Sequence, residues 1–292
     1  MCIIIAKYFD GIGWAGAKNR DRKYIPTLDF IESDDHGVGR MMMHDQVTGY
    51  KEGINSHGVS ILNTSLDVLD DEPDVEEGKA ESSPDGAIIA NALLHDNPLN
   101  AVHYIIKKEL VGCTIVFDKD DLFLVEASDQ DGSKPYKYVV KRIPKTETVT
   151  RTNHGIWLPW ASFQRVEGDT QQTADRISSE ARLLQAQKVV EDAETPQDLV
   201  DGMCKVNTTN SQLNIMRMST GKDEFRTTSQ QLCVPSERTL YCRPVSSNLK
   251  FDFWTLNKPK PNVWVEILSN RALWQKNEDK QPFKDLNLKD VK

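Results

Sequence analysis

Apolar runs alternate with turn residues along much of the chain, in a pattern typical of short strands. Runs rich in Val, Ile, Phe and Thr predict strands near 2–9, 58–64, 113–118, 121–127, 136–143, 227–234 and 238–245. Residues 118–121, where the runs 113–118 and 121–127 meet, predict a tight turn. The strands gather towards the two ends of the chain, so the helices are expected between them.

Helix signals fill the intervening stretches. Ser83-Pro84 and Asn97-Pro98 each place an N-cap residue before a proline, and they open helices that are expected to end near Leu94 and Lys108. A later helix is capped by Thr195-Pro196-Gln197-Asp198.

The longest expected helix runs near 170–192. Apolar residues at helical spacing put four side chains on one of its faces: Ala174, Ile177, Ala181 and Leu184. Groups of strands with helices between them fit an α+β fold in which two antiparallel sheets pack between helical layers.

Length and composition favour one domain. The 292 residues can bury a sizeable core as one large domain or two small ones. The sequence contains no internal repeat, no low-complexity tract and no linker rich in Pro, Gly and Ser. The acidic stretch 67–81 is interpreted as a solvated surface loop.

Charge excludes one class of partner. A formal net charge of −8 without a large basic cluster argues against nucleic acid as a ligand. One short segment is basic, with Lys18, Arg20, Arg22 and Lys23. It is either an exposed polar turn or a rim that attracts anionic substrates, and the sequence leaves both interpretations open.

The five cysteines, an odd number without a CxxC pair, predict reduced thiols and a cytoplasmic protein. No apolar run approaches ~20 residues, and the run from Met1 to Ala6 is too short for a signal peptide, so we expect neither export nor a membrane partner. The six histidines lack a ligand spacing, and we expect no metal and no cofactor.

One motif suggests a different chemistry. Residues 11–16 match the dinucleotide-binding pattern GxGxxG, and Glu32 follows at a suitable distance. The residues that should form its helix, 17–27, carry consecutive charges and Pro26 and show no helical periodicity. We therefore interpret the glycines as a turn between the first strand and a second strand that returns beside it.

Cys2 is the main candidate for chemistry. If Met1 is removed, Cys2 carries a nucleophilic thiol and a free α-amine on one residue. An α-amine titrates at about 7.7–8.0 and a thiol at about 8.5, so the amine can accept the thiol proton at neutral pH. The returning strand would bring Arg20 or Asp21 beside this pair, where a carboxylate can hold the ammonium and a guanidinium can orient a substrate carboxylate or carbonyl. A buried cysteine without a catalytic role is the plain alternative.

Several segments of the chain carry a family resemblance: Cys2 with its strand, Asn19-Arg20-Asp21, Gly53 to Val59 with Asn63-Thr64, Gly112 to Asp118 with Leu122 to Glu126, Thr152-Asn153-His154, Ser178-Ser179 with Arg182, and Thr227 to Gln230. In this order they resemble the N-terminal nucleophile (Ntn) hydrolases of the choloylglycine hydrolase, penicillin V acylase and acyl-CoA:6-aminopenicillanic acid acyltransferase group. The resemblance extends from residue 2 to about 245.

The resemblance implies a fold and a division of the chain. The implied fold is a four-layer αββα sandwich of two antiparallel sheets between helical layers. It forms a single domain over residues 1–245, with 246–292 as a C-terminal extension packed on it. The extension is expected to cover a sheet edge or to make a homo-oligomer contact. Loops at 22–50, 64–82 and 155–170 are expected to build the substrate pocket.

The resemblance also implies site residues. Cys2 is the nucleophile, Asp21 holds its α-amine, and Asn153 donates to the oxyanion, with Asn63 as a second candidate. Further candidates from weaker matches are Arg20 for catalysis or substrate binding, Trp157 for an apolar acyl site, and Arg226 for a late active-site arginine. His154 is interpreted as structural.

The implied function is hydrolysis of a linear C–N amide bond in a non-peptide or small-molecule substrate, through a thioester acyl-enzyme. An acyltransferase that uses the same Cys2, and a non-catalytic binding or structural protein, remain alternatives. Cleavage before Cys113 would make that residue the nucleophile, but no Asn-Arg-Asp run follows it. We therefore favour Cys2.

Overall fold

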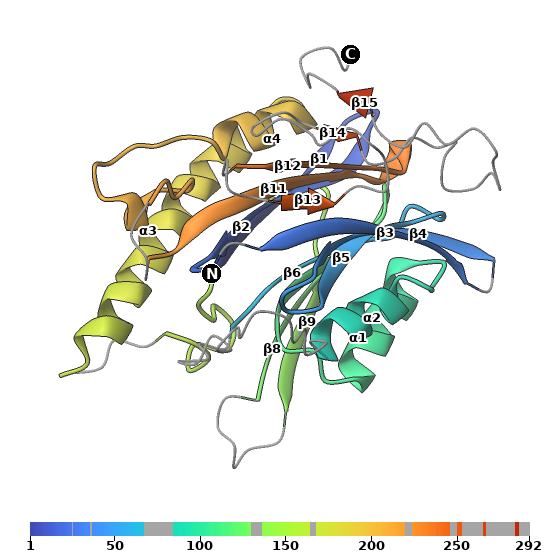
Figure 1. Ribbon diagram of the computed structural model, residues 1–292. Helices are drawn as coiled ribbons and strands as arrows, with labels where there is room; N and C mark the ends of the chain where they lie inside the picture. The colour runs from blue at the N-terminus through green and yellow to red at the C-terminus, as the bar shows by residue number, and fades with distance from the viewer. Residues whose placement is uncertain are drawn as a thin grey trace.

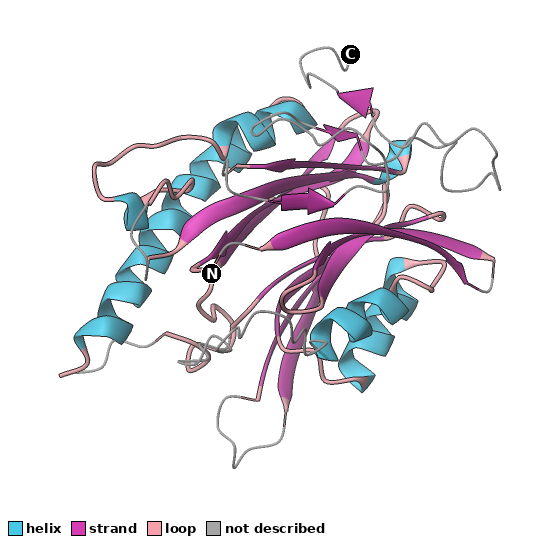
Figure 2. Ribbon diagram, viewed as in Figure 1, coloured by secondary structure: helices cyan, strands magenta, loops and turns pink. Residues whose placement is uncertain are grey.

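The computed structural model describes residues 1–24, 26–35, 37–66, 84–129, 136–163, 168–219, 224–245, 250–252, 265–266 and 284–285. These residues form two β-sheets that pack face to face, with helices on the outer face of each sheet (Figures 1 and 2). The expected α+β sandwich with αββα layers is confirmed.

The first sheet contains strands from both ends of the region, residues 2 to about 245, that carries the family resemblance. Its strand order is β10 (Val149–Arg151), β1 (Cys2–Phe9), β2 (Gly13–Arg22), β11 (Arg226–Val234), β12 (Thr239–Pro244), β14 (Val265–Glu266) and β15 (Lys284–Asp285). Every neighbouring pair for which a register is defined is antiparallel. Two helices cover this sheet, α3 (Thr170–Asp192) and α4 (Pro196–Gly202).

The second sheet is built from strands between residues 27 and 142 and from one short strand at 250–252. Its strand order is β13 (Lys250–Asp252), β3 (Thr27–Asp35), β4 (Val38–Asp45), β5 (Tyr50–Asn55), β6 (Ser60–Thr64), β7 (Gly112–Phe117), β8 (Leu122–Ser128) and β9 (Lys137–Arg142). The short strand β13 runs parallel to β3, and the other pairs are antiparallel. Helices α1 (Pro84–Ala92) and α2 (Pro98–Lys107) cover the outer face.

Strand β1 is buried on both faces, which explains its unbroken apolar run. Ile4 and Ala6 point between the two sheets, where one hydrophobic cluster lies. Ile3 and Ile5 point the other way, into the cluster beneath α3 and α4. Successive side chains of a strand alternate between its faces. The side chain of Cys2 therefore belongs to the layer between the sheets.

The glycine-rich segment forms the turn between β1 and β2, as expected. Gly11 and Gly13 both have positive φ angles, of 78° and 97°. A Cβ atom on Gly13 would collide with the carbonyl oxygen of Lys119, so glycine is required there for space as well as for conformation. The turn leads directly into β2 and not into a helix, which excludes the dinucleotide-binding interpretation.

Two expectations are corrected. Most of the segment 22–50 is not a loop, because β3 and β4 form a hairpin that pairs with β5. The four apolar residues of α3 do share a face, but that face points towards solvent, with Ile177 46% and Leu184 67% exposed. The polar residues Ser178, Ser179 and Arg182 are buried instead.

Two further expectations concern the acidic stretch 67–81 and the chain beyond residue 245. Residues 67–83, which contain the acidic stretch and most of one expected pocket loop, lie outside the described residues. Beyond residue 245, β13 pairs with β3 and β14 pairs with β12. The division of the chain at residue 245 stays a prediction. No helix in the described part of the chain is long and apolar enough to cross a membrane.

Candidate active site

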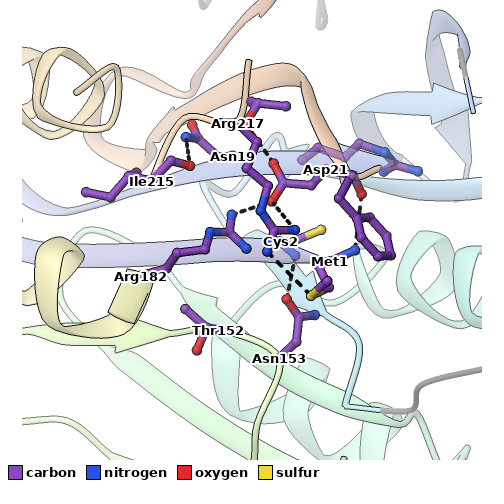
Figure 3. Close-up of polar contacts among 12 residues, drawn as sticks. Met1, Cys2, Asn19, Asp21, Thr152, Asn153, Arg182, Ile215 and Arg217 are labelled. Carbon is purple, nitrogen blue, oxygen red and sulfur yellow. Dashed lines mark hydrogen bonds and ion pairs between the residues drawn. The ribbon is translucent and has the colours of Figure 1, made fainter. Parts of the chain in front are cut away.

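Cys2 lies at the start of β1, which pairs with β10 on one side and with β2 on the other. In the β1–β2 register Cys2 faces Arg20, and Asp21 faces Met1 through two backbone hydrogen bonds of 2.9 and 3.2 Å. The Cys2 residue is only 3% exposed. Figure 3 shows how residues from β2, α3 and the segments after β10 and η1 (Ser211–Leu213) gather around it.

Asn153 holds the backbone nitrogen of Cys2. Its Oδ1 accepts a hydrogen bond from that nitrogen at 2.7 Å, and its Nδ2 donates to Thr64 Oγ1 at 2.9 Å and to the Ser65 carbonyl oxygen at 2.8 Å. A backbone N–H can only donate and a carbonyl oxygen can only accept, so these partners fix the orientation of the amide. Both amide hydrogens are used, and none is left for an oxyanion in this arrangement.

Helix α3 holds the backbone of Asn153 through Ser179. The Asn153 backbone nitrogen donates to Ser179 Oγ at 3.1 Å, and His154 Nδ1 lies 2.8 Å from the same oxygen. Burial and the nearby charge of Arg176 lower the pKa of His154 to about 4, so the ring is neutral at pH 7. These contacts agree with the interpretation of His154 as a structural residue.

Asp21 lies on the opposite face of β2 from the thiol. Its Oδ2 forms a buried ion pair with Arg182 of α3, and its Oδ1 accepts from Thr227 Oγ1 at 2.8 Å. Arg217 Nη1 is 3.7 Å from the same Oδ2. The carboxylate is therefore held by three groups. Its backbone oxygen, not its side chain, contacts the α-amine of Met1.

The thiol of Cys2 lies beside a cation. Arg22 Nη1 is 3.6 Å from Cys2 Sγ. Burial by itself raises the pKa of the thiol, but the nearby charges, above all those of Lys18 and Arg22, outweigh it and lower the pKa to about 7. Burial lowers the pKa of the Met1 α-amine to about 5. Three fully buried cysteines differ, since burial raises the pKa of Cys113, Cys233 and Cys242.

A buried charge cluster lies between the sheets on the thiol's face of β2. Lys18 Nζ contacts both oxygens of Glu52, at 2.8 and 2.6 Å, and the Asn63 carbonyl oxygen at 2.6 Å. Arg20 pairs with Asp45 at 2.9 Å and with Glu52 at 3.4 Å. Burial opposes ionisation of Glu52, but Lys18 and Arg20 outweigh it and lower its pKa. Lys18 and Arg20 are thus buried, and neither forms an exposed turn or rim.

The side chains of three predicted residues make no hydrogen bond or ion pair with Cys2 in the described part of the chain. Arg20 is engaged by the carboxylates of the charge cluster. The Asn63 side chain donates to Thr114 and Val111 and accepts from Tyr50. Trp157 is half-buried beneath the cations of Arg151 and Lys141, whose charged groups lie 4.6 and 4.3 Å from its ring centre. Cys2, Asp21 and Asn153 are brought together, and the roles assigned to all six residues stay predictions.

A second arginine, Arg217, lies beside Asp21 in addition to Arg182, and the role expected of Arg226 stays a prediction. Arg217 lies between η1 and β11, and its Nη2 donates to Ser178 Oγ at 2.6 Å and lies 3.8 Å from the sulfur of Met1. The side-chain amide of Asn19 ties this segment to β2 through the carbonyl oxygen of Ile215, at 3.2 Å. No sequence motif surrounds Arg217, so only its distance from Asp21 in the fold could identify it.

The loop after Asn153 is anchored by one carboxylate. Glu126 Oε1 accepts hydrogen bonds from the backbone nitrogens of Ile156, Trp157 and Leu158, at 2.8, 2.8 and 2.7 Å. Its Oε2 lies 3.7 Å from Arg151 Nε. Glu126 belongs to a hairpin that is part of the family resemblance. Its contacts give it a structural role, which is to hold the loop of residues 156–158. No group of three or more metal-ligating side chains is found among the described residues.

Comparison with known proteins shows the fold. No family model and no curated protein matches this sequence. The chain is similar to a mutant conjugated bile acid hydrolase from Clostridium perfringens, with 11% identity, a TM-score of 0.51, and coverage of 85% of this chain and 90% of that chain. A second variant of that hydrolase aligns with the same values. Penicillin V acylase from Agrobacterium tumefaciens aligns over 98% of this chain and 99% of that chain, with 13% identity and a TM-score of 0.46.

Proposed function

We propose that this chain, on the fold that it shares with the conjugated bile acid hydrolase, is a cysteine amidohydrolase that cleaves a C–N amide bond of a small-molecule or non-peptide substrate. One observation carries the proposal. The nitrogen of Cys2 is held by Asn153, while its thiol has a pKa of about 7 and lies beside Arg22. A nucleophile and a proton carrier on one residue are what amide cleavage by an N-terminal cysteine needs.

The mechanism begins once Met1 is removed. The Cys2 thiolate attacks the amide carbonyl carbon, and the carbonyl electron pair moves to the oxygen. The α-ammonium of Cys2 then gives a proton to the leaving nitrogen as the C–N bond breaks, which leaves a thioester on sulfur. Water, deprotonated by the α-amine, attacks the thioester and releases the acid and the thiolate.

The neighbouring side chains take positioning roles in this proposal. Asn153 Oδ1 holds the α-amine at the distance seen for the Cys2 nitrogen, and Asp21, held by Arg182, fixes the strand end that carries it. Hydrogen bonds to a charged donor are roughly twice as strong as neutral ones, so the contact to Asn153 gains strength once the nitrogen is an ammonium.

The test starts with intact mass and N-terminal sequencing of the purified protein. A chain that begins at Cys2 supports the proposal, whereas a chain that keeps Met1 in the active preparation contradicts it. Amide substrates are then screened with the wild-type protein, Cys2→Ala and Cys2→Ser. Cys2→Ala is expected to lose activity completely, and a thioester adduct on the Cys2 peptide should be trapped by mass spectrometry. Cys113→Ala is the matched control.

An acyltransferase would form the same thioester and is the second candidate. The two activities separate when an acceptor amine is added to the acyl-enzyme. Transfer that outcompetes hydrolysis at millimolar amine identifies a transferase, and unchanged release of free acid identifies a hydrolase. If Cys2→Ala keeps every measurable activity of the protein, the non-catalytic alternative holds.

A further inference from the structure

The described charged groups around Cys2 do not balance. On the thiol's face of β2 the cations Lys18, Arg20 and Arg22 outnumber the carboxylates Asp45 and Glu52 by one. A thiolate on Cys2 balances this charge, but one positive charge is again without a counter-ion once the sulfur is bonded to an acyl group. Such a charge is costly where it is buried, so the surplus favours a substrate that carries an anion.

Arg22 is the cation of this group that combines access to solvent with contact to the nucleophile. Its side chain is 16% exposed, whereas the side chains of Arg20, Arg182 and Arg217 are fully buried. Lys18 and Arg20 are each paired with a carboxylate at 2.9 Å or less. The carboxylate closest to Arg22 is that of Asp45, at 3.9 Å from its Nε, and this carboxylate already serves Arg20.

The guanidinium of Arg22 is held in a fixed position. Its Nε donates to the Tyr24 hydroxyl at 3.1 Å, and that hydroxyl donates in turn to Asp45 at 2.5 Å. Its Nη1 donates to the Asp21 carbonyl oxygen at 2.9 Å and lies 3.6 Å from the thiol of Cys2. Its Nη2 makes no hydrogen bond with any described residue. A guanidinium fixed on one side presents its remaining donors to a ligand at little entropic cost.

We propose that Arg22 is a specificity-determining residue, which binds a carboxylate or a similar anionic group that the substrate carries next to its scissile amide. This inference rests on the proposed amidohydrolase function and names its substrate class. The attacked carbon must lie about 3–3.5 Å from the sulfur, so an anion on Arg22 is separated from that carbon by about two or three bonds. Neutral amides bind the same site without this contact.

A pair of alkylating reagents tests the proposal without knowledge of the substrate. Iodoacetate and iodoacetamide are nearly equal in size, and with each the Cys2 sulfur forms a bond to the CH₂ carbon while iodide leaves. Only iodoacetate carries a carboxylate. The rate of modification of the Cys2 peptide is followed by mass spectrometry for both reagents, in the wild-type protein, Arg22→Gln and Lys23→Gln.

The ratio of the two rates is the decisive quantity, because a change in thiolate fraction affects both reagents equally and cancels. We expect the ratio of iodoacetate to iodoacetamide rates to fall roughly 10- to 100-fold in Arg22→Gln, the loss of one hydrogen bond to a charged group. Lys23→Gln removes the same charge one residue further on and should leave the ratio within about threefold of the wild-type value, since exposed charges are screened.

Three results would overturn the proposal: an unchanged ratio in Arg22→Gln, an equal fall in both variants, or a Cys2 that neither reagent modifies. Arg22→Lys is a second test in case the glutamine variant does not fold. It keeps the positive charge but loses the planar arrangement of guanidinium donors. It should give an intermediate ratio. Thermal unfolding of each variant checks that the comparison is made between folded proteins.

Substrate pairs then place the anion. An N-acylglycine carries a carboxylate on the leaving amine, and the corresponding glycinamide does not. A succinyl amide carries a carboxylate on the acyl part, and a butyryl amide does not. In whichever pair the wild-type enzyme prefers the anionic member, Arg22→Gln should raise the KM for that member only. Hydrolysis of the neutral amides without any charge preference would leave the proposed function standing and remove this inference.

Discussion

The side-chain oxygen of Asn153 lies 2.7 Å from the backbone nitrogen of Cys2, and the two residues are 151 positions apart in the chain. This contact joins the loop after β10 to the first residue of β1. Because the amide hydrogens of Asn153 are bound by Thr64 and Ser65, the oxygen has no freedom to turn away. The α-amine of a mature Cys2 would be held by the same oxygen.

Asn153→Ala is therefore expected to reduce turnover roughly 100-fold, the lower range for loss of general acid–base positioning. An acceptor favours the charged form of an amine, so its loss lowers the pKa of the α-amine. Because the α-amine acts as an ammonium in acylation, this change moves the alkaline limb of the kcat/KM profile to lower pH. A residue that only donates to the oxyanion would reduce the rate without moving this limb. Kinetics from pH 5 to 9 separate the two roles.

Arg182 is expected to stabilise the fold through its fully buried pair with Asp21. Arg182→Met leaves the buried carboxylate with the longer contact to Arg217, at 3.7 Å, and the Thr227 hydroxyl, and breaking such a pair costs about 3–5 kcal/mol. Urea unfolding measures the loss. Arg176→Met is the control on the same helix, because its pair with Glu180 is partly exposed and contributes below about 1 kcal/mol.

A second variant decides whether charge explains the loss. Asp21→Asn combined with Arg182→Met removes the stranded carboxylate and should recover part of the stability lost in Arg182→Met. If both substitutions simply add, the ion pair does not hold α3 against β2.

Glu126 is expected to control the order of the loop that follows Asn153. Glu126→Ala leaves three backbone N–H groups of residues 156–158 without their acceptor, each at a cost of about 1–3 kcal/mol if it stays buried. Hydrogen exchange of these amides should become at least tenfold faster than in the wild-type protein. Glu147→Ala, at an exposed position, should leave exchange in this loop unchanged. Equal exchange in both variants would mean that other contacts fix the loop.

Much of the fold could be predicted because strands buried on both faces and capped helices leave strong local signals. The run after Cys2 and the Asn97-Pro98 cap both gave elements with nearly the observed bounds. The hairpin of β3 and β4 was missed, since Met41, Met42 and Met43 stand in succession and hide the alternation. Its register depends on pairing with β5, which is not a local property.

Helix α3 shows why the apolar pattern misled. Ile177 and Leu184 suggested a buried face, but the sheet beneath this helix offers polar partners: the Asn153 backbone for Ser179 and the Asp21 carboxylate for Arg182. A polar helix face is buried where it meets buried polar groups. The candidate site was predicted in part for a similar reason. Cys2, Asp21 and Asn153 lie in recognisable sequence segments, whereas Arg217 lies in an irregular segment without a motif.

Lys18 provides the last prediction, which concerns the pKa of the Cys2 thiol. Of the charges that lower the pKa of the Cys2 thiol to about 7, that of Lys18 is the largest, and Glu52 holds the ammonium between the sheets. Lys18→Met removes this charge while the burial that raises the pKa remains. The pKa of the thiol should therefore rise, and less thiolate should be present at pH 7.

The measurement is the rate of Cys2 modification by neutral iodoacetamide between pH 5 and 10. In the wild-type protein the rate should increase with pH through a midpoint near 7, because the thiolate is the reactive form. In Lys18→Met the midpoint should move upward by about one pH unit or more, equivalent to roughly 1.4 kcal/mol. Lys18→Arg keeps the charge and should move the midpoint less. A midpoint that stays near 7 in Lys18→Met would show that Arg22 and the α-amine suffice to hold the thiolate.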